Sequence, residues 1–187
     1  SPMSAPAFPS LTVLPQQHLK GRYQIQVIDL FETPHLARRT QIGHWEIDTV
    51  QGSARACLVT GVERATGYAV IGKLNAGTTE ALIARVTPLL RDQPHPVRTI
   101  TADNGSEMTG YRYLERALGT RFYFTQPYSA WQRGSIEHLN GLIRRVDPKR
   151  TDFTPVTQQE CHRLARQLNQ RPRRRLGFRT PEECYER

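Results

Sequence analysis

The sequence predicts a mixed α/β domain, and three observations support this prediction. Three short apolar segments rich in β-branched residues follow one another between residues 44 and 74. After residue 75, segments with helical period alternate with short strand-like segments. The chain of 187 residues, 37% of them hydrophobic, has the length and apolar content of one domain with a single core.

The first three strands are expected at residues 44–50 (HWEIDTV), 54–63 (ARACLVTGVE) and 67–74 (GYAVIGKL). Gly52 and the sequence RATG separate them, and such short links favour an antiparallel meander.

The later elements are expected in this order: a helix over 76–90, a strand over 96–103, a helix over 106–119, a strand over 121–126, a helix within 131–150 that Pro148 stops, and a helix from Thr157 to Pro172. Thr78 or Thr79 is the expected cap of the first helix, and Gly119 is expected to close the second.

Residues 1–20 contain four prolines among small and polar residues, so we expect a flexible lead-in there and a folded core over 21–187. No segment has the length and apolarity of a membrane span or a signal peptide. Three cysteines, odd in number and far apart, lack a zinc-type spacing and suit a reducing compartment. We therefore expect a cytoplasmic protein with no membrane partner.

The chain is basic, with 26 Lys and Arg against 17 Asp and Glu and a formal charge of +9. From Arg133 to Arg187 there are thirteen basic residues against seven acids, so the excess is concentrated at the C-terminal end. Such a balance favours a polyanionic partner without choosing which polyanion.

Asp103 follows the strand-like residues 100–102 directly and precedes Asn104-Gly105, a strong turn signal. It could therefore be a turn residue, or a carboxylate presented at the end of a strand, where sites gather in α/β sheets. Asp48 in the first strand and Glu137 near the start of a helix are candidate partners.

Carboxylates about 4 Å apart repel by roughly 4 kcal/mol at an effective dielectric near 20, so a cluster of three needs a cation. Oxygen ligands favour Mg²⁺ or Mn²⁺.

The motifs WEIDTV, TADNGSEM, PYSAWQRGSIEHLNGLIRR and DPKRTDF, followed by LNQRPRRRLGFRTPEE, resemble the catalytic core of insertion-sequence-30 family transposases. That family is part of the Asp-Asp-Glu transposase and retroviral integrase superfamily. The resemblance runs from about residue 21 to 186 and is most specific over 127–145. It departs from the family at Ile47, where Gly is usual, and at His44, where a second acid is usual.

The resemblance implies a ribonuclease H-like fold, in which three antiparallel strands precede parallel strands and helices flank the mixed sheet. It implies that Asp48, Asp103 and Glu137 are the catalytic residues and bind two Mg²⁺ or Mn²⁺ ions. The implied reaction is phosphodiester hydrolysis that frees a 3′-hydroxyl, followed by strand transfer into target DNA. A non-catalytic DNA-binding regulator and a nuclease without joining activity are the alternatives.

The implied partners are double-stranded DNA, as transposon terminal inverted repeats and target DNA, and further copies of the chain in a homodimer or higher synaptic multimer. The implied location is the bacterial cytoplasm, at the nucleoid. The family also carries a helix-turn-helix region, for which residues 1–20 are too short, so we expect a catalytic fragment.

Several other residues are candidates for contact with DNA. Asn140 and Arg144 follow Glu137 at i+3 and i+7, which places all three along one helix face, opposite an apolar stripe. The other candidates are Arg133, Trp131, Arg145, Arg173 and Arg174. Trp131 could stack on an unpaired base or pack as a lid on the core. Glu46 shares a strand face with Asp48. It could be a spare ligand or a hydrogen-bonding neighbour, but we expect it to be a solvent-facing charge. His138 is expected to lie outside the acidic site.

Overall fold

A computed structural model describes residues 39–125 and 133–187 of the chain. The predicted lead-in over 1–20 and the predicted contact residue Trp131 lie outside the described residues. In chain order the elements are β1 (His44–Gln51), β2 (Cys57–Glu63), β3 (Ala69–Leu74), α2 (Thr79–Arg91), β4 (Thr99–Ala102), η1 (Ser106–Gly110), α3 (Tyr111–Leu118), β5 (Arg121–Phe124), α4 (Gly134–Val146), α5 (Gln158–Asn169), η3 (Arg174–Leu176) and α6 (Pro181–Tyr185).

The five strands form one sheet in the order β3-β2-β1-β4-β5. The first three pair antiparallel through short turns, whereas β4 lies parallel to β1 and β5 lies parallel to β4. The predicted meander, followed by helix-linked parallel strands, is therefore confirmed. Parallel pairing needs a crossover connection, which α2 and α3 supply.

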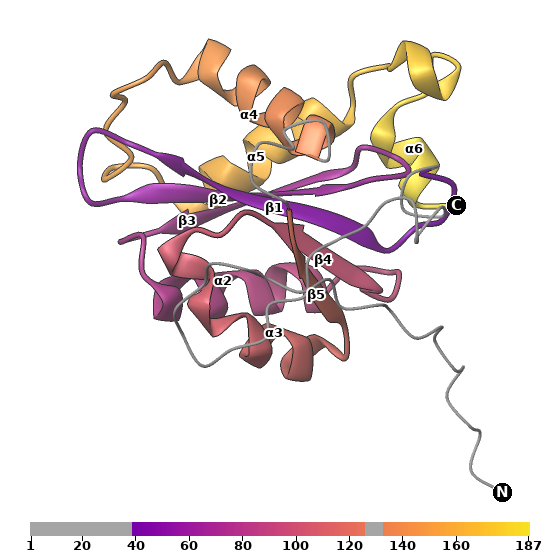
Figure 1. The fold of residues 1–187 in the computed structure, drawn as a ribbon. Coiled ribbons are helices and arrows are strands. Elements are labelled where there is room, and N and C mark those ends of the chain that lie inside the picture. The colour runs from indigo at the N-terminus through magenta and orange to yellow at the C-terminus, as the bar shows by residue number, and fades with distance from the viewer. Residues whose placement is uncertain (1–38, 126–132) are drawn as a thin grey trace, which may run out of the picture.

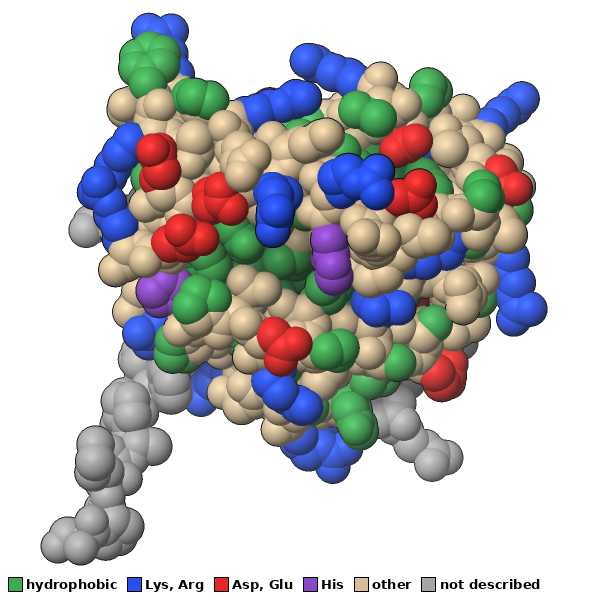
Figure 2. All heavy atoms as spheres, turned by 180° about the vertical axis from the view of Figure 1, so that it is seen from behind, with side chains coloured by type: hydrophobic (Ala, Val, Ile, Leu, Met, Phe, Trp, Pro, Cys, Tyr) green, Lys and Arg blue, Asp and Glu red, His purple; other side chains and the backbone are tan. Residues whose placement is uncertain are grey.

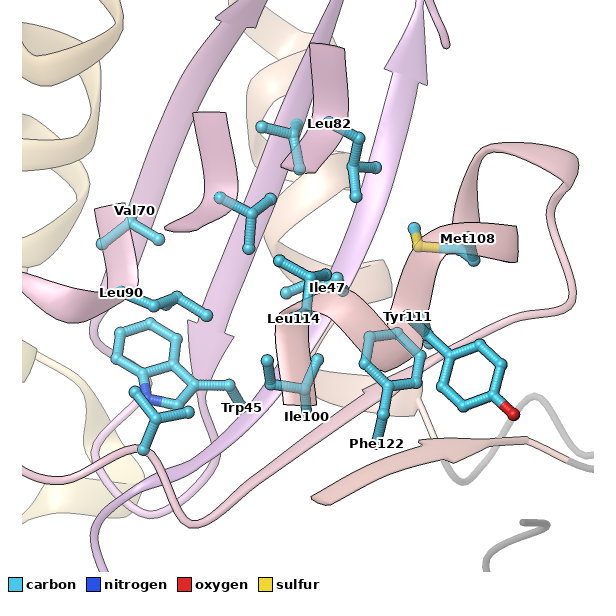
Figure 3. Packing of buried hydrophobic residues seen from close by; sticks show 14 of the residues in the cluster. Trp45, Ile47, Val70, Leu82, Leu90, Ile100, Met108, Tyr111, Leu114 and Phe122 are labelled. Carbon is cyan, nitrogen blue, oxygen red and sulfur yellow. The ribbon is translucent and has the colours of Figure 1, made fainter. Parts of the chain in front are cut away.

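Helices cover both faces of this sheet (Figure 1), with α2 and α3 on one side and α4 and α5 on the other. Alternation along β1 divides its side chains between the two layers. Trp45 and Ile47 point into the core beneath α2 and α3, where Figure 3 shows them packed near Leu82, Leu90 and Leu114. Val50, on the opposite face, packs in the core formed with α4 and α5. His44, Glu46 and Asp48 therefore face the α4 layer.

The helix ends follow the sequence signals closely. The Thr78 side chain accepts a hydrogen bond from the Ala81 amide at the start of α2, and Gly119 ends α3 with a left-handed φ of 62°. Thr157 and Glu160 form a reciprocal capping box on α5. None of the helices in the described residues is long and apolar enough to cross a membrane.

The helix predicted over 106–119 is wrong in its first part, because residues 106–110 form the separate 3₁₀ turn η1. Gly110, the last residue of η1, packs against α2. A Cβ atom built there would lie 2.5 Å from side-chain atoms of both Thr79 and Ile83, so only glycine lets the chain approach α2 so closely.

Candidate active site

The two predicted aspartates meet because β1 and β4 are neighbouring parallel strands. Glu46 pairs with Thr101 in the β1–β4 register, and continuing that register by two residues brings Asp48 beside Asp103. Asp103 follows β4 directly, and its Oδ1 accepts a hydrogen bond from the Gly105 amide at 3.1 Å. Asp103 is thus both a turn residue and a carboxylate presented at the end of a strand.

A single guanidinium lies between the two aspartates. Arg133 forms an ion pair with Asp48, Nη2 to Oδ2 at 2.8 Å, and a second with Asp103, Nη1 to Oδ2 at 3.0 Å. The Arg133 side chain is 12% exposed and that of Asp48 21%, so the Arg133–Asp48 pair is largely shielded from water. The positive charge of Arg133 therefore stands where a bound cation would balance both carboxylates.

Helix α4 supplies a second contact to Asp48. The Asn140 amide donates from Nδ2 to Asp48 Oδ2 at 2.9 Å, and its Oδ1 accepts a hydrogen bond from the Thr60 hydroxyl at 2.8 Å. Because an ionised carboxylate only accepts, the Nδ2 end of the amide faces Asp48, which leaves Oδ1 to accept from Thr60. Thr60 is fully buried on β2 and pairs with Asp48 across the β1–β2 ladder.

Glu137, the third predicted ligand, lies on α4 one turn before Asn140 and is exposed. Within residues 39–125 and 133–187, no group of three His, Cys, Asp or Glu side chains is close enough to hold a metal ion. The structure thus brings Asp48 and Asp103 together around Arg133 and places Glu137 on the adjoining helix, apart from that pair.

Glu46 is completely buried, so the expectation of a solvent-facing charge is wrong. Its Oε1 lies 3.4 Å from Nε of Arg64, which is also buried, and its Oε2 accepts a hydrogen bond from the Ile136 amide at 2.9 Å. Ile136 lies in the first turn of α4, where backbone amides lack partners within the helix and favour a negative charge. Glu46 therefore caps α4 from the sheet and fixes the helix that carries Glu137 and Asn140.

Burial is the main electrostatic influence on both acids of this face. It raises the pKa of Asp48, and Arg133 and the Thr49 amide oppose the rise while the charge of Asp103 adds to it. Burial likewise raises the pKa of Glu46, against the lowering effects of Arg64 and the Ile136 amide. Both carboxylates thus depend on nearby positive charge to stay ionised.

Two residues near the aspartates escaped the sequence analysis. The Thr49 hydroxyl, beside Asp48, donates to Glu107 Oε1 at 2.7 Å, which ties β1 to η1. Thr60 has no local signal either, and only the antiparallel register of β1 and β2 would have pointed to it. Both contacts join residues far apart in the chain, so no spacing rule reveals them.

The arginines predicted to contact DNA do not form one cluster: they lie on or just before α4 and in the segment after α5. Arg144 donates to the backbone carbonyl of Gln51, the last residue of β1, at 2.6 Å. It also donates to the carbonyl of Pro148, just after α4, at 3.3 Å. Arg145 is exposed on the same helix. Arg173 and Arg174 lie beyond α5, and Arg173 contacts His138 rather than either aspartate. His138 is thus apart from the aspartates, as predicted.

Comparison with known proteins agrees with this geometry. The family model described as "Integrase core domain" matches residues 38–130. The chain is 37% identical over 161 residues to the transposase of insertion sequence element IS4351 from Bacteroides fragilis, covering 84% of this chain and 49% of that protein. It is 36% identical over 154 residues to the transposase InsI of IS30A from Escherichia coli, covering 82% of this chain and 40% of that protein. The chain thus spans less than half the length of these curated relatives.

The fold of the chain is similar to that of a solved structure. The catalytic core domain of BIV integrase superposes with a TM-score of 0.57 at 20% identity, over 77% of this chain and 93% of that domain. This likeness confirms the predicted ribonuclease H-like fold, and the two transposases confirm the resemblance drawn from the motifs. The chain belongs to the insertion-sequence-30 family of transposases, of which it carries the integrase core.

Proposed function

We propose that this core cuts a DNA phosphodiester bond, frees a 3′-hydroxyl and joins that hydroxyl to target DNA. The observation that carries the proposal is the convergence of Asp48 and Asp103 on one positive charge, next to the helix that carries Glu137. Paired carboxylates that converge on a cation suit in-line phosphoryl displacement.

The donor set fits divalent ions of the magnesium type. The oxygens of Asp48 and Asp103 already converge on the nitrogens of Arg133, which stand in for the cation. These are hard oxygen donors, which Mg²⁺ and Mn²⁺ prefer, and Glu137 would complete the set from α4. When bound, two such ions would activate the attacking oxygen and stabilise the leaving oxygen.

The surrounding residues hold the carboxylates in place. Asn140 orients Asp48, Thr60 orients Asn140, and Glu46 holds the first turn of α4 against β1. In this arrangement the protein contributes mainly position and charge, so no covalent enzyme intermediate is required.

The proposed substrate is double-stranded DNA, first as the element's terminal inverted repeats and then as target. Arg145 is exposed on α4, on the same helix as Glu137, and is well placed to contact the phosphate backbone. Arg144 would serve first to join the end of β1 to the segment after α4, because it binds the carbonyls of Gln51 and Pro148. Since both ends of an element must be joined together, we propose that at least two copies of the chain act in one complex.

The first experiment tests the metal site without DNA. Isothermal titration calorimetry should show that the parent chain binds Mn²⁺ and that Asp103→Asn does not. The matched control is Glu80→Gln, which removes an exposed acid from α2 on the other face of the sheet. Absence of Mn²⁺ binding in the parent chain would favour a non-catalytic DNA-binding regulator.

The second experiment tests the reaction. With Mg²⁺ and DNA that carries the element's ends, the parent chain should cut and join, and Glu137→Gln should do neither. Activity retained in Glu137→Gln would remove Glu137 from the site. Cleavage without joined products in the parent chain would identify a nuclease instead.

A further inference from the structure

A cavity of about 440 Å³ lies beside the first turns of α4. Its lining includes four arginines together with Ser135 and His138 from α4: Arg39, Arg173, Arg174 and Arg175. Among the described residues that line it, none is acidic. We call this cavity the arginine pocket.

Among the described residues no ion pair joins the arginines of the pocket to an acid, although the charge of the buried Glu63 acts on Arg175. Arg173 reaches the Nε2 atom of His138 at 3.2 Å, and Arg175 donates to the carbonyl of Ala65 at 2.9 Å. Because a guanidinium only donates, His138 Nε2 must accept, which makes this imidazole neutral. These contacts orient two of the guanidinium groups, and neither contact involves an acid.

Burial, together with this crowding of positive charge, lowers the pKa of two groups in the pocket, His138 and Arg175. Burial lowers the pKa of His138, and the positive charges of Arg173, Arg145 and Arg175 lower it further. Burial and the charges of Arg39 and Arg173 likewise lower the pKa of Arg175, while the charge of Glu63 opposes this fall. Like charges held together in a partly buried cavity are stabilised by an anion, and arginine's forked donors match phosphate.

An exposed aromatic residue stands in the same loop. Phe178 is 73% exposed and has a φ of 63°, an unusual conformation for a residue with a side chain. Its amide donates to the carbonyl of Arg173, which folds the loop back on itself. In Figure 1 this loop projects from the α4 and α5 layer above α6. An exposed aromatic beside a basic pocket is the arrangement by which proteins hold an unpaired base next to its phosphate.

We propose that the arginine pocket binds one backbone phosphate of the DNA and that Phe178 stacks on an unpaired base beside it. The proposal rests on the proposed function, since it places this phosphate on the strand held at Asp48. His138 and Asn140 are two residues apart and so lie on nearly opposite sides of α4. A phosphate in the pocket would therefore lie about one helix diameter, roughly 10 Å, from the aspartates.

The face in Figure 2 shows why total charge alone would not locate such a site. Lys and Arg side chains are spread across that face, and Asp and Glu side chains lie between them. The arginine pocket differs because its lining, over residues 39–125 and 133–187, contains several cations and no acid. We therefore expect its contribution to DNA binding to be separable from that of the surface as a whole.

The test is fluorescence anisotropy of a labelled duplex with a short unpaired end, measured across a range of salt concentrations. In Arg173→Gln/Arg174→Gln, the slope of log K against log salt should fall by about 0.9, the value for one phosphate contact on duplex DNA. Phe178→Ala should weaken binding of the unpaired-end duplex by fivefold or more, with the slope unchanged and fully paired DNA bound as before.

Two control variants test whether a general loss of positive charge or a loss of folding could explain weaker DNA binding. Arg116→Gln removes an exposed cation from α3, on the other side of the sheet, and should leave the slope at its parent value. Arg174→Gln alone should fold normally, because its side chain makes no hydrogen bond or ion pair with the described residues, and it should still weaken DNA binding.

The outcomes separate this inference from the proposed function. If the parent chain binds DNA and the double variant has the parent's slope and affinity, the pocket proposal is overturned. If Phe178→Ala binds unpaired ends like the parent, the stacking proposal is overturned. Mn²⁺ binding should persist in all these variants, because none changes an aspartate. If the parent chain itself does not bind Mn²⁺, the proposed metal site is wrong, and the pocket proposal is unaffected.

Discussion

Arg133 provides the sharpest test of the active-site geometry. It contributes a positive charge to Asp48 and Asp103 at 2.8 Å and 3.0 Å, so a divalent ion that uses the same oxygens must displace it. Arg133→Gln removes the charge and keeps a side chain of polar character. We expect this variant to bind Mn²⁺ more tightly than the parent chain and to be less stable without metal.

The magnitude follows from the two ion pairs. A hydrogen bond to a charged group contributes about 1.5–3 kcal/mol when shielded, and an exposed pair contributes about 0–1 kcal/mol. The Asp48 contact is shielded, whereas Asp103 is 44% exposed, so its share is small. The competition that Arg133 offers is then about 2 kcal/mol, which corresponds to roughly thirtyfold in Mn²⁺ affinity.

The unfolding free energy should change in the opposite direction. Without Arg133 the two aspartates repel each other, so the metal-free variant should lose about 1–2 kcal/mol of stability. Saturating Mn²⁺ should restore much of this loss, because the ion replaces the missing charge. Thermal melts in chelator and in Mn²⁺ would therefore show a larger metal-induced shift for Arg133→Gln than for the parent chain.

Calorimetry provides the affinity, and Arg144→Gln is the matched control. Arg144 is a cation on the same helix that binds backbone carbonyls rather than either aspartate. A general effect of net charge would strengthen Mn²⁺ binding equally in both variants. Unchanged or weaker Mn²⁺ binding in Arg133→Gln would refute the idea that the guanidinium and the metal use the same oxygens.

Three further predictions concern the scaffold and the arginine pocket. Glu46→Gln should lower the unfolding free energy by about 3 kcal/mol in urea denaturation, because Arg64 stays charged and buried, and adding Arg64→Met should recover part of that loss. Asn169→Ala should cost about 2–4 kcal/mol in the same assay, because its buried amide bonds both the backbone N–H and C=O of one residue of β3, at 2.7 and 2.9 Å. The folded state disfavours protonated His138, so its pKa, followed by NMR, should lie below the ordinary 6.5 and rise in Arg173→Gln; a value unchanged by that substitution would contradict the charge crowding described above.

Local chemistry was sufficient to predict the framework of this fold. Short apolar segments rich in β-branched residues marked β1 to β3, helical spacing of apolar residues marked α4, and Thr157 marked the start of α5. These signals work because strand and helix geometry repeats over a few residues. The position of Asp103 at the end of a strand was predictable for the same reason. Its role as a metal ligand came from the family resemblance and stays a prediction.

Only the tertiary structure decided what the side chains of the site contact. Glu46 looked like a surface charge, but packing of α4 over β1 buried it against Arg64 and a helix amide 90 residues away. Arg133, predicted to contact DNA, lies between two aspartates from different strands. These contacts join segments that the sheet order and helix packing bring together, and no short spacing in the sequence encodes that arrangement.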